Sequence, residues 1–206
     1  MHTESIHQDR RMPWLHGALH CLLVTCLAMI PVWTWALDVQ GTKVDDSATV
    51  AGTTLPLQGA GMRYKAVFKV YAGALYANEK IRSLDALLRN PGPKRLSMTF
   101  VRDIDANSFG KLLTRGVEDN TPKSELSKLV PGLLRMSEMF SANKSLSPGD
   151  VVTVDWIPGT GMVISVKGKP QGEPFKDADF YRAIMGIWLG PVPADHKLKD
   201  ALLGAS

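Results

Sequence analysis

Histidine and cysteine, the residue types that most often carry nucleophilic or metal chemistry, are concentrated at the start of this 206-residue chain. Both cysteines, Cys21 and Cys26, and four of the five histidines precede residue 37, which leaves His196 alone in the remainder. A structural metal site needs several such ligands, and a Ser-His-Asp triad needs a positioned histidine. His196 lies between Asp195 and Lys197, a setting typical of a solvated helix residue. We therefore predict no catalytic residue of these kinds, no metal site and no cofactor.

The first forty residues have the features of a targeting segment. Residues 15–36 are mostly apolar and contain no Lys, Arg, Asp or Glu, and Arg10 and Arg11 precede them. The end of this run, Thr34-Trp35-Ala36, resembles a cleavage site with small residues on either side of a variable one. Such an order is typical of a secretory signal peptide. We therefore predict a signal peptide at 1–36, a mature domain at 37–206 and a periplasmic or secreted location.

Two other readings of this segment remain open. Residues 18–36 are just long enough to span a bilayer, but Pro31 interrupts them and no basic residue follows as a stop signal. Residues 23–26 weakly resemble a lipoprotein acylation box, in which Thr25 is bulkier than that signal prefers. Cleavage after Ala36 leaves 170 residues without cysteine, so packing alone must stabilise the mature chain. We expect no stable membrane insertion after processing.

Composition and charge narrow the class of protein further. Hydrophobic residues make up 45% of the chain and charged residues 21%, which excludes a disordered chain, a collagen-like repeat and a disulfide-dense miniprotein. Lys and Arg exceed Asp and Glu by 24 to 20, and no basic run is interleaved with aromatic residues. We therefore predict no nucleic-acid partner.

The elements that would position a site are indicated by hydrophobic periodicity. Residues 66–78 alternate with a period of two, which predicts a long strand with one face on a core. Further strands are predicted at 49–51, 53–55, 95–102, 151–157 and 161–166, the last two forming a hairpin through Pro158-Gly159-Thr160.

Helical spacing dominates the centre and the end of the chain. A short helix at 83–89 precedes one that begins after a cap at Asp105 or Asn107 and carries Phe109, Leu112, Leu113 and Val117 on one face. A second helix begins at Thr121-Pro122, and Pro131-Gly132 predicts a kink or an end within it. A helix through 180–189 and a short one capped by Asp195 follow. This order predicts an α+β domain, an antiparallel sheet with helices on one side.

Two adjoining motifs resemble the chalcone isomerase-like family. Residues 59–65 match G-x-G-x-R-x-K, and residues 69–76 match K-V-Y-x-x-x-L-Y. Arg102-Asp103-Ile104, Pro148-Gly149-Asp150 and the ending Ile187-Trp188-Leu189-Gly190 resemble the secreted bacterial branch of that family. The resemblance covers residues 37–204. It implies an open-faced β-sandwich, in which helices pack on one face of a large antiparallel sheet with a cleft between them.

The resemblance also implies a choice between two activities. Plant isomerases of the family close a chalcone to a flavanone with an arginine, a threonine, a tyrosine and an asparagine, whereas other members bind fatty acids through an arginine and a tyrosine. Here the arginine falls on Arg63, and the threonine position falls on Tyr71, as in the fatty-acid binders. The last two positions fall on Phe109 and Gly116, whose side chains offer no donor to a developing enolate. We therefore expect no useful chalcone isomerisation.

The leading hypothesis is a secreted, non-catalytic chalcone isomerase-like protein that binds a small amphipathic ligand such as a fatty acid. Arg63 suits the acid group because a guanidinium holds a carboxylate bidentately. The candidate ligand-binding residues are Arg63, Tyr71, Phe109 and Trp188. The eight residues between Arg63 and Tyr71 would span roughly 26 Å in one strand, so the two share a site only if the chain folds back between Tyr64 and Phe68.

Two alternative functions stay open at the level of sequence. One is an isomerase or lyase of the same fold that acts on an unknown substrate, which a side-chain acid or base in the cleft would favour. The other is a protein-interaction module whose cleft is closed by large side chains such as Trp188, Phe109 and Met185.

Overall fold

The structure is a computed structural model of the full chain and describes His2 and residues 36–205. Trp35–Ser206 forms one compact unit. Both hydrophobic clusters of the described chain lie inside this unit, so we expect it to fold without residues 1–34. The predicted signal peptide, Cys21 and Cys26 included, falls almost entirely outside the described residues. None of the described helices is long and apolar enough to cross a membrane.

A seven-stranded antiparallel sheet forms the centre of the unit, in the order β11-β10-β9-β6-β5-β4-β3. Its strands are β3 (Ser47–Val50), β4 (Thr53–Lys65), β5 (Phe68–Ala77), β6 (Lys94–Phe100), β9 (Val151–Ile157), β10 (Gly161–Val166) and β11 (Lys169–Pro170). Two small sheets join β1 (Ala36–Val39) to β2 (Thr42–Asp45), and β7 (Ile104–Asp105) to β8 (Ser145–Leu146). The hairpin predicted at 158–160 connects β9 to β10.

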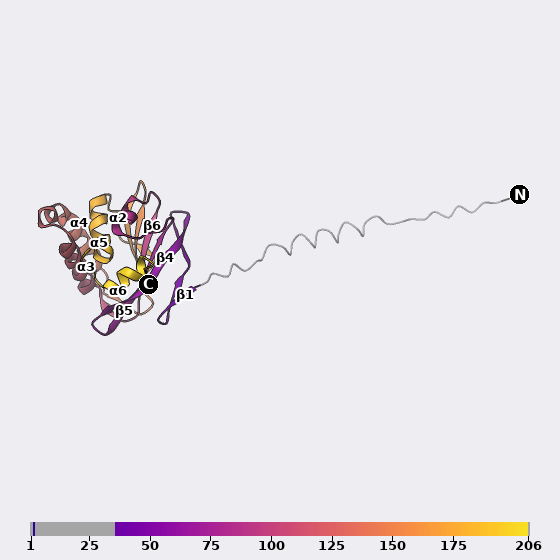
Figure 1. Cartoon of the computed structure of the whole chain (residues 1–206), viewed down its shortest axis with the longest axis horizontal. Helices are drawn as coiled ribbons and strands as arrows, with labels where there is room; N and C mark the ends of the chain where they lie inside the picture. The colour runs from indigo at the N-terminus through magenta and orange to yellow at the C-terminus, as the bar shows by residue number, and fades with distance from the viewer. Residues whose placement is uncertain (1, 3–35, 206) are drawn as a thin grey trace. The chain divides into compact units, whose positions relative to one another are not determined.

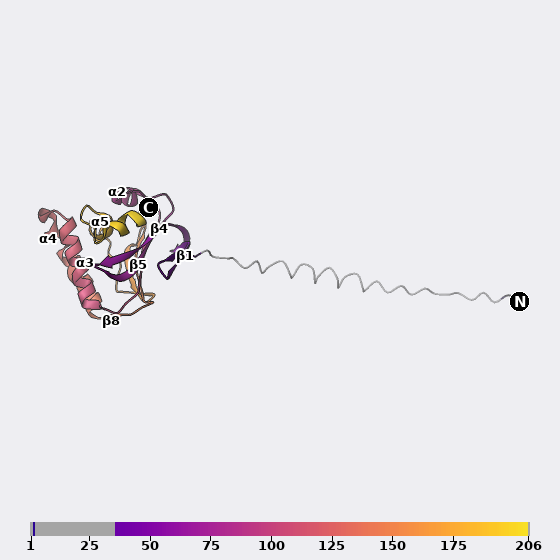
Figure 2. The same cartoon turned by 60° about the horizontal axis from the view of Figure 1, so that its bottom comes forward.

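Five helices complete the described domain: α2 (Leu84–Arg89), α3 (Ala106–Asn120), α4 (Lys123–Ser141), α5 (Ala178–Leu189) and α6 (His196–Leu202). The α5 helix packs against α2, α3, α4, α6 and β10, while α6 lies on β4 and β5. Figures 1 and 2 agree in placing α3 and α4 side by side, at the end of the domain away from β1. The expected α+β architecture, an antiparallel sheet with packed helices, is confirmed.

The caps of α2 and α3 follow the predicted chemistry, whereas the predicted start of α4 is wrong: α4 begins at Lys123, and Pro122 takes the capping position without a side-chain hydrogen bond. Ser83 and Asp105 accept hydrogen bonds from the first turns of α2 and α3, at 3.1 and 2.7 Å. The structure excludes an end at Pro131, because α4 continues through it to Ser141. Pro131 lies on the exposed face, while Leu129, Leu133, Met136 and Phe140 form a continuous buried face on both sides of it. Packing of that face therefore outweighs the lost backbone hydrogen bond.

The β5 strand is buried on both faces, whereas its periodicity predicted one. Tyr71, Leu75 and Ala77 belong to the core beneath the helices. Ala72, Ala74 and Tyr76 belong to a second core with residues of β1–β4. The small β1–β2 sheet packs over this end of the large sheet and covers the second face. The strand also begins at Phe68 rather than Ala66, because Ala66 adopts a φ of 53° in the turn.

A buried lysine in β6 makes the free energy of unfolding vary with pH in the alkaline range. Lys94 is 2% exposed, and its ammonium donates to the Gly92 carbonyl at 3.0 Å. Burial lowers its pKa from 10.5 to about 8. The unfolded chain therefore binds more protons than the folded chain between these values, so this residue makes folding more favourable as pH rises from 8 to 10.5.

We expect Lys94→Met to stabilise the domain at pH 7 and to lose that advantage at high pH. The difference in unfolding free energy should shrink by about 3 kcal/mol between pH 7 and pH 10.5, because one pKa unit corresponds to about 1.4 kcal/mol. Urea titrations of both proteins across this range measure it, and other titrating groups cancel in the comparison. A difference that does not vary with pH would contradict a buried, proton-releasing Lys94.

Candidate ligand-binding site

The β4–β5 hairpin brings the two leading candidate residues together. The chain reverses between Lys65 and Phe68, and antiparallel pairing then aligns Arg63 directly opposite Tyr71. Directly opposed residues of a sheet share a face. The guanidinium carbon of Arg63 lies 5.8 Å from the centre of the Tyr71 ring. The fold-back that the sequence required is therefore present, and it places both side chains at one site.

A cavity of about 560 Å³ adjoins this pair, within the range of about 300–1,000 Å³ that small-molecule sites occupy. It lies between the β4–β5 hairpin, the segment that follows β6, and α3. Its apolar wall includes Val70, Phe109, Leu112, Leu113, Ile187 and Ala194. Its charged lining consists of Arg63, Lys65, Arg102, Asp103 and Asp105. Such a lining, apolar in the interior with charged groups added, suits an amphipathic molecule.

Tyr71 lines this cavity and carries a buried, neutral hydroxyl. The residue is 2% exposed, and burial raises the pKa of its phenol to about 12, against the opposing effect of the Arg63 charge. Its oxygen accepts a hydrogen bond from the Trp188 indole N–H at 2.7 Å. Among the described residues no acceptor takes the proton of this hydroxyl. Tyr71 can therefore donate to a ligand oxygen while Trp188 holds it in place.

The Tyr71–Trp188 hydrogen bond gives a direct test of this arrangement. We expect Tyr71→Phe to lower the free energy of unfolding by about 1–3 kcal/mol, because the buried indole N–H of Trp188 is left without a partner. Adding Trp188→Phe removes that unpaired donor, so the double variant should lose less than the two single losses combined. Urea denaturation of the four proteins measures the coupling. Strictly additive losses would show that the bond contributes nothing.

Arg63 keeps its donors available to a ligand. Its side chain is half-buried, and it makes no ion pair or hydrogen bond with any other described residue. The nearby carboxylate of Asp195 is already engaged, because it accepts from the backbone N–H groups of Tyr64, Lys197 and Leu198 at 2.9–3.2 Å. A cation left unpaired at a partly buried site is suited to bind an anionic group.

The other sequence candidates divide between the cavity wall and the core. Phe109 is 4% exposed and stands edge-on to the Tyr71 ring, with centres 6.4 Å apart, so it forms part of the wall. Trp188 lies behind Tyr71 and is absent from the cavity lining. Gly116, placed at the family's asparagine position, faces α5 instead, and a β-carbon added there would approach Ile187 to 2.9 Å. A longer side chain at 116 would therefore enter the helix interface.

The family model described as chalcone isomerase-like matches residues 36–204 of this chain. The chain belongs to the chalcone isomerase-like family. Among solved structures, the domain is similar to the crystal structure of the Arabidopsis thaliana fatty-acid-binding protein AtFAP1, with a TM-score of 0.64 and 15% sequence identity. The match covers 82% of this chain and 95% of that one. A search of curated proteins gives no significant match. The expected chalcone isomerase-like fold is thus confirmed.

Three residues of the chalcone isomerase-like cavity were not singled out from the sequence. Lys65 and Arg102 add positive charge at the edge of the cavity, and the guanidinium of Arg102 lies 5.0 Å from the centre of the Phe68 ring. Ser108 lines the same edge of the cavity, and hydrogen bonds from its side chain and from its backbone N–H hold the pKa of the Asp105 carboxyl below its usual range. Asp105 therefore stays ionised as a helix cap. Two of them stand in motifs quoted from the sequence: Arg102 opens Arg102-Asp103-Ile104, and Lys65 ends the motif at 59–65.

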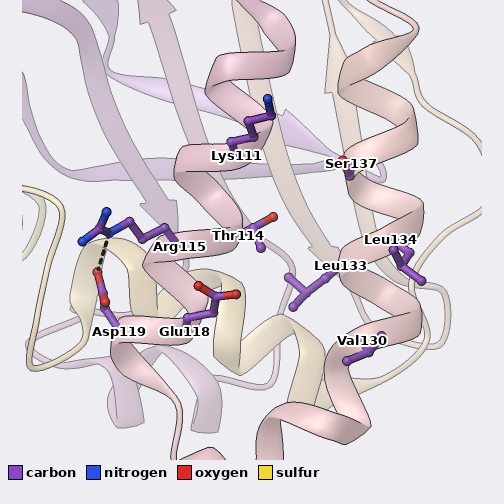
Figure 3. Close-up of a pocket in the computed structure, with 9 residues that line it drawn as sticks. All are labelled: Lys111, Thr114, Arg115, Glu118, Asp119, Val130, Leu133, Leu134 and Ser137. Carbon is purple, nitrogen blue, oxygen red and sulfur yellow. Dashed lines mark ion pairs between the residues drawn. The ribbon is translucent and has the colours of Figure 1, made fainter.

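A second hollow of about 510 Å³ lies between α3 and α4 of the chalcone isomerase-like domain (Figure 3). Arg115 and Asp119 face each other across one turn of α3 at 3.8 Å, and both side chains are largely exposed. Val130 and Leu134 on α4 are also exposed, at 46% and 61%. An exposed pair of this kind is typical of a solvated helix surface. This hollow offers no buried polar group to orient a ligand.

The described part of the domain contains no arrangement of side chains typical of a metal site. Among His2 and residues 36–205, no group of three His, Cys, Asp or Glu side chains is arranged to hold a metal ion. His196, at the first position of α6, is exposed.

Proposed function

We propose that this chain is an exported, non-catalytic member of the chalcone isomerase-like family that binds a small amphipathic acid, such as a fatty acid. The carboxylate lies against Arg63 and receives a hydrogen bond from the Tyr71 hydroxyl. The alkyl chain runs along the apolar wall that includes Phe109. Trp188 acts through Tyr71, by fixing the direction of its hydroxyl.

The observation that carries this proposal is the unpaired Arg63 beside a buried, neutral tyrosine donor at a mostly apolar cavity. A guanidinium and a phenol together offer the donors that a carboxylate accepts, and the charge-assisted bond is the stronger of the two. The similarity to a protein described as fatty-acid-binding supports the same ligand class. The cavity stays open beside Phe109, while Trp188 and Met185 are buried in the core, which disfavours a closed interaction module.

The experiment that tests the proposal identifies what the protein carries. The protein is purified under native conditions, and mass spectrometry identifies the small molecules that denaturation releases. We expect acids with a long alkyl chain, in an amount approaching one per protein chain, and a marked loss of them from Arg63→Ala. A preparation that releases no such acid, and that takes none up when it is added, would overturn the proposal.

No ring-closing step is part of this function. Isomerisation of a chalcone needs donors placed at the developing enolate, and each missing donor costs about 2.7–4 kcal/mol of transition-state stabilisation. Phe109 and Gly116 stand at two of the family's polar positions, and Gly116 faces α5. We expect the absorbance of a chalcone to decay at its spontaneous rate in the presence of the protein. A saturable acceleration that Arg63→Ala abolishes would establish an isomerase instead.

A further inference from the structure

The tip of the β4–β5 hairpin exposes apolar side chains to solvent. Val67 and Phe68 are 81% and 59% exposed, the first at the apex of the turn and the second at the start of β5. Leu112 of α3, 40% exposed, lines the cavity together with Phe68. The hairpin projects at the lower edge of Figure 1. Phe68 and Leu112 line the cavity, Val67 adjoins Phe68 at the apex of the turn, and we call these three residues the rim.

Positive charge surrounds the rim. Lys65 and Lys69 flank the apex along the chain, and both are exposed. Arg102 is exposed as well, and its guanidinium lies over the Phe68 ring. Two carboxylates lie at the same mouth, of which Asp105 is engaged as the cap of α3. Three cations of the cavity lining face its two carboxylates, whereas the ammonium of Lys69 donates to the Gln40 carbonyl oxygen at 3.2 Å.

We propose that the rim docks this protein on the surface of an anionic lipid bilayer. Exposed apolar side chains enter the boundary between headgroups and acyl chains, while neighbouring lysine and arginine side chains bind anionic headgroups. An aromatic and two aliphatic side chains at a projecting edge, ringed by cations, match both requirements. The docking is peripheral: the rim rests on one leaflet.

From the position of the rim beside the cavity we infer that docking serves ligand exchange, and this inference rests on the proposed function. Phe68 and Leu112 of the rim, and Arg102 beside it, also belong to the cavity lining. A docked domain therefore opens its cavity toward the bilayer. An acyl chain then passes between bilayer and cavity without exposing its methylenes to water, an exposure that the hydrophobic effect makes unfavourable.

Vesicle binding of residues 36–206, the unit with its own core, tests the docking. Sedimentation compares vesicles of phosphatidylcholine and phosphatidylglycerol in equal parts with vesicles of phosphatidylcholine alone. We expect binding to the anionic vesicles only. Val67→Glu should weaken it about tenfold or more, because the change removes an apolar anchor and adds a charge of the same sign as the bilayer.

Leu134→Glu is the matched control, since it makes the same change of charge at a 61% exposed leucine on α4 (Figure 3). It should bind anionic vesicles within about twofold of wild type, because its site is away from the rim. Equal losses in the two variants, or wild-type protein that stays in the supernatant, would overturn the proposal.

A fatty-acid titration without vesicles separates the docking proposal from the proposed function. If the acid binds and the vesicles do not, docking fails and the proposed function stands; the reverse result overturns only the proposed function.

Discussion

Arg63→Ala should weaken the binding of a fatty acid by about thirtyfold or more. Removing one partner of a partly buried, charge-assisted pair costs about 2–5 kcal/mol, and 2 kcal/mol already corresponds to about thirtyfold in affinity. The structure gives Arg63 no other partner among the described residues, so its donors are available to the ligand. The fold should survive, because no described hydrogen bond is lost. Fluorescence or calorimetric titration measures the change, and thermal melts confirm folding.

Two further variants sharpen this result. Arg63→Lys should recover only part of the affinity, since an ammonium cannot form the bidentate contact of a guanidinium. Arg102→Ala removes an exposed arginine from the edge of the same cavity. We expect a loss of affinity below about fivefold, and this loss should decrease at high salt. Equal affinities for wild type, Arg63→Ala and Arg63→Lys would exclude Arg63 as the anchor of the ligand.

Gly59→Ala should destabilise the domain by about 3 kcal/mol, through the contact between β4 and α6. A β-carbon at this position would clash with the Ala201 carbonyl oxygen and lie 2.9 Å from that of Leu202. Both are backbone atoms, so the helix itself must shift, and its buried Leu198 and Leu202 would lose their packing. Overpacking of this kind costs about 1–3 kcal/mol, and the cost is at the upper end of this range when the obstructing atoms are rigid. Urea denaturation provides the measurement.

Gly73→Ala is the natural control for that variant. Its added β-carbon would meet only leucine side chains, that of Leu198 at 3.2 Å and that of Leu202 at 3.8 Å, and a leucine can adjust its rotamer. We therefore expect a loss below about 1.5 kcal/mol. Should Gly59→Ala be no less stable than Gly73→Ala, the close approach of α6 to β4 would be refuted.

Local signals made much of the fold predictable. The caps at Ser83 and Asp105, and the hairpin at 158–160, depend on residues within one turn of one another, and each lies where its chemistry predicts. Two of the failures involve distant contacts. The proline in α4 is tolerated because of the core beneath it, and the second buried face of β5 exists because β1–β2 packs over it. No spacing within a single element encodes either contact.

The candidate site also contains residues that the sequence indicated and positions that only distant contacts determine. The resemblance to the family gave Arg63, Tyr71 and Phe109, and the structure places all three around one cavity. The position of Trp188 was not predictable, because its hydrogen bond to Tyr71 joins residues 117 apart in the chain. The sharp turn that aligns Arg63 with Tyr71 contains Ala66 at positive φ instead of the usual glycine, so the turn itself carried no sequence signal.

The central claim is that Arg63 and Tyr71 bind the carboxylate of an amphipathic ligand, and paired titrations of wild-type protein test it most directly. A saturated fatty acid is compared with the alcohol of the same chain length, so that the apolar contacts are matched and only the acid group differs. We predict one bound acid per chain and an alcohol that binds at least about thirtyfold more weakly, by the same pair energetics. Equal affinity for acid and alcohol, or no saturable binding of the acid, would contradict the account.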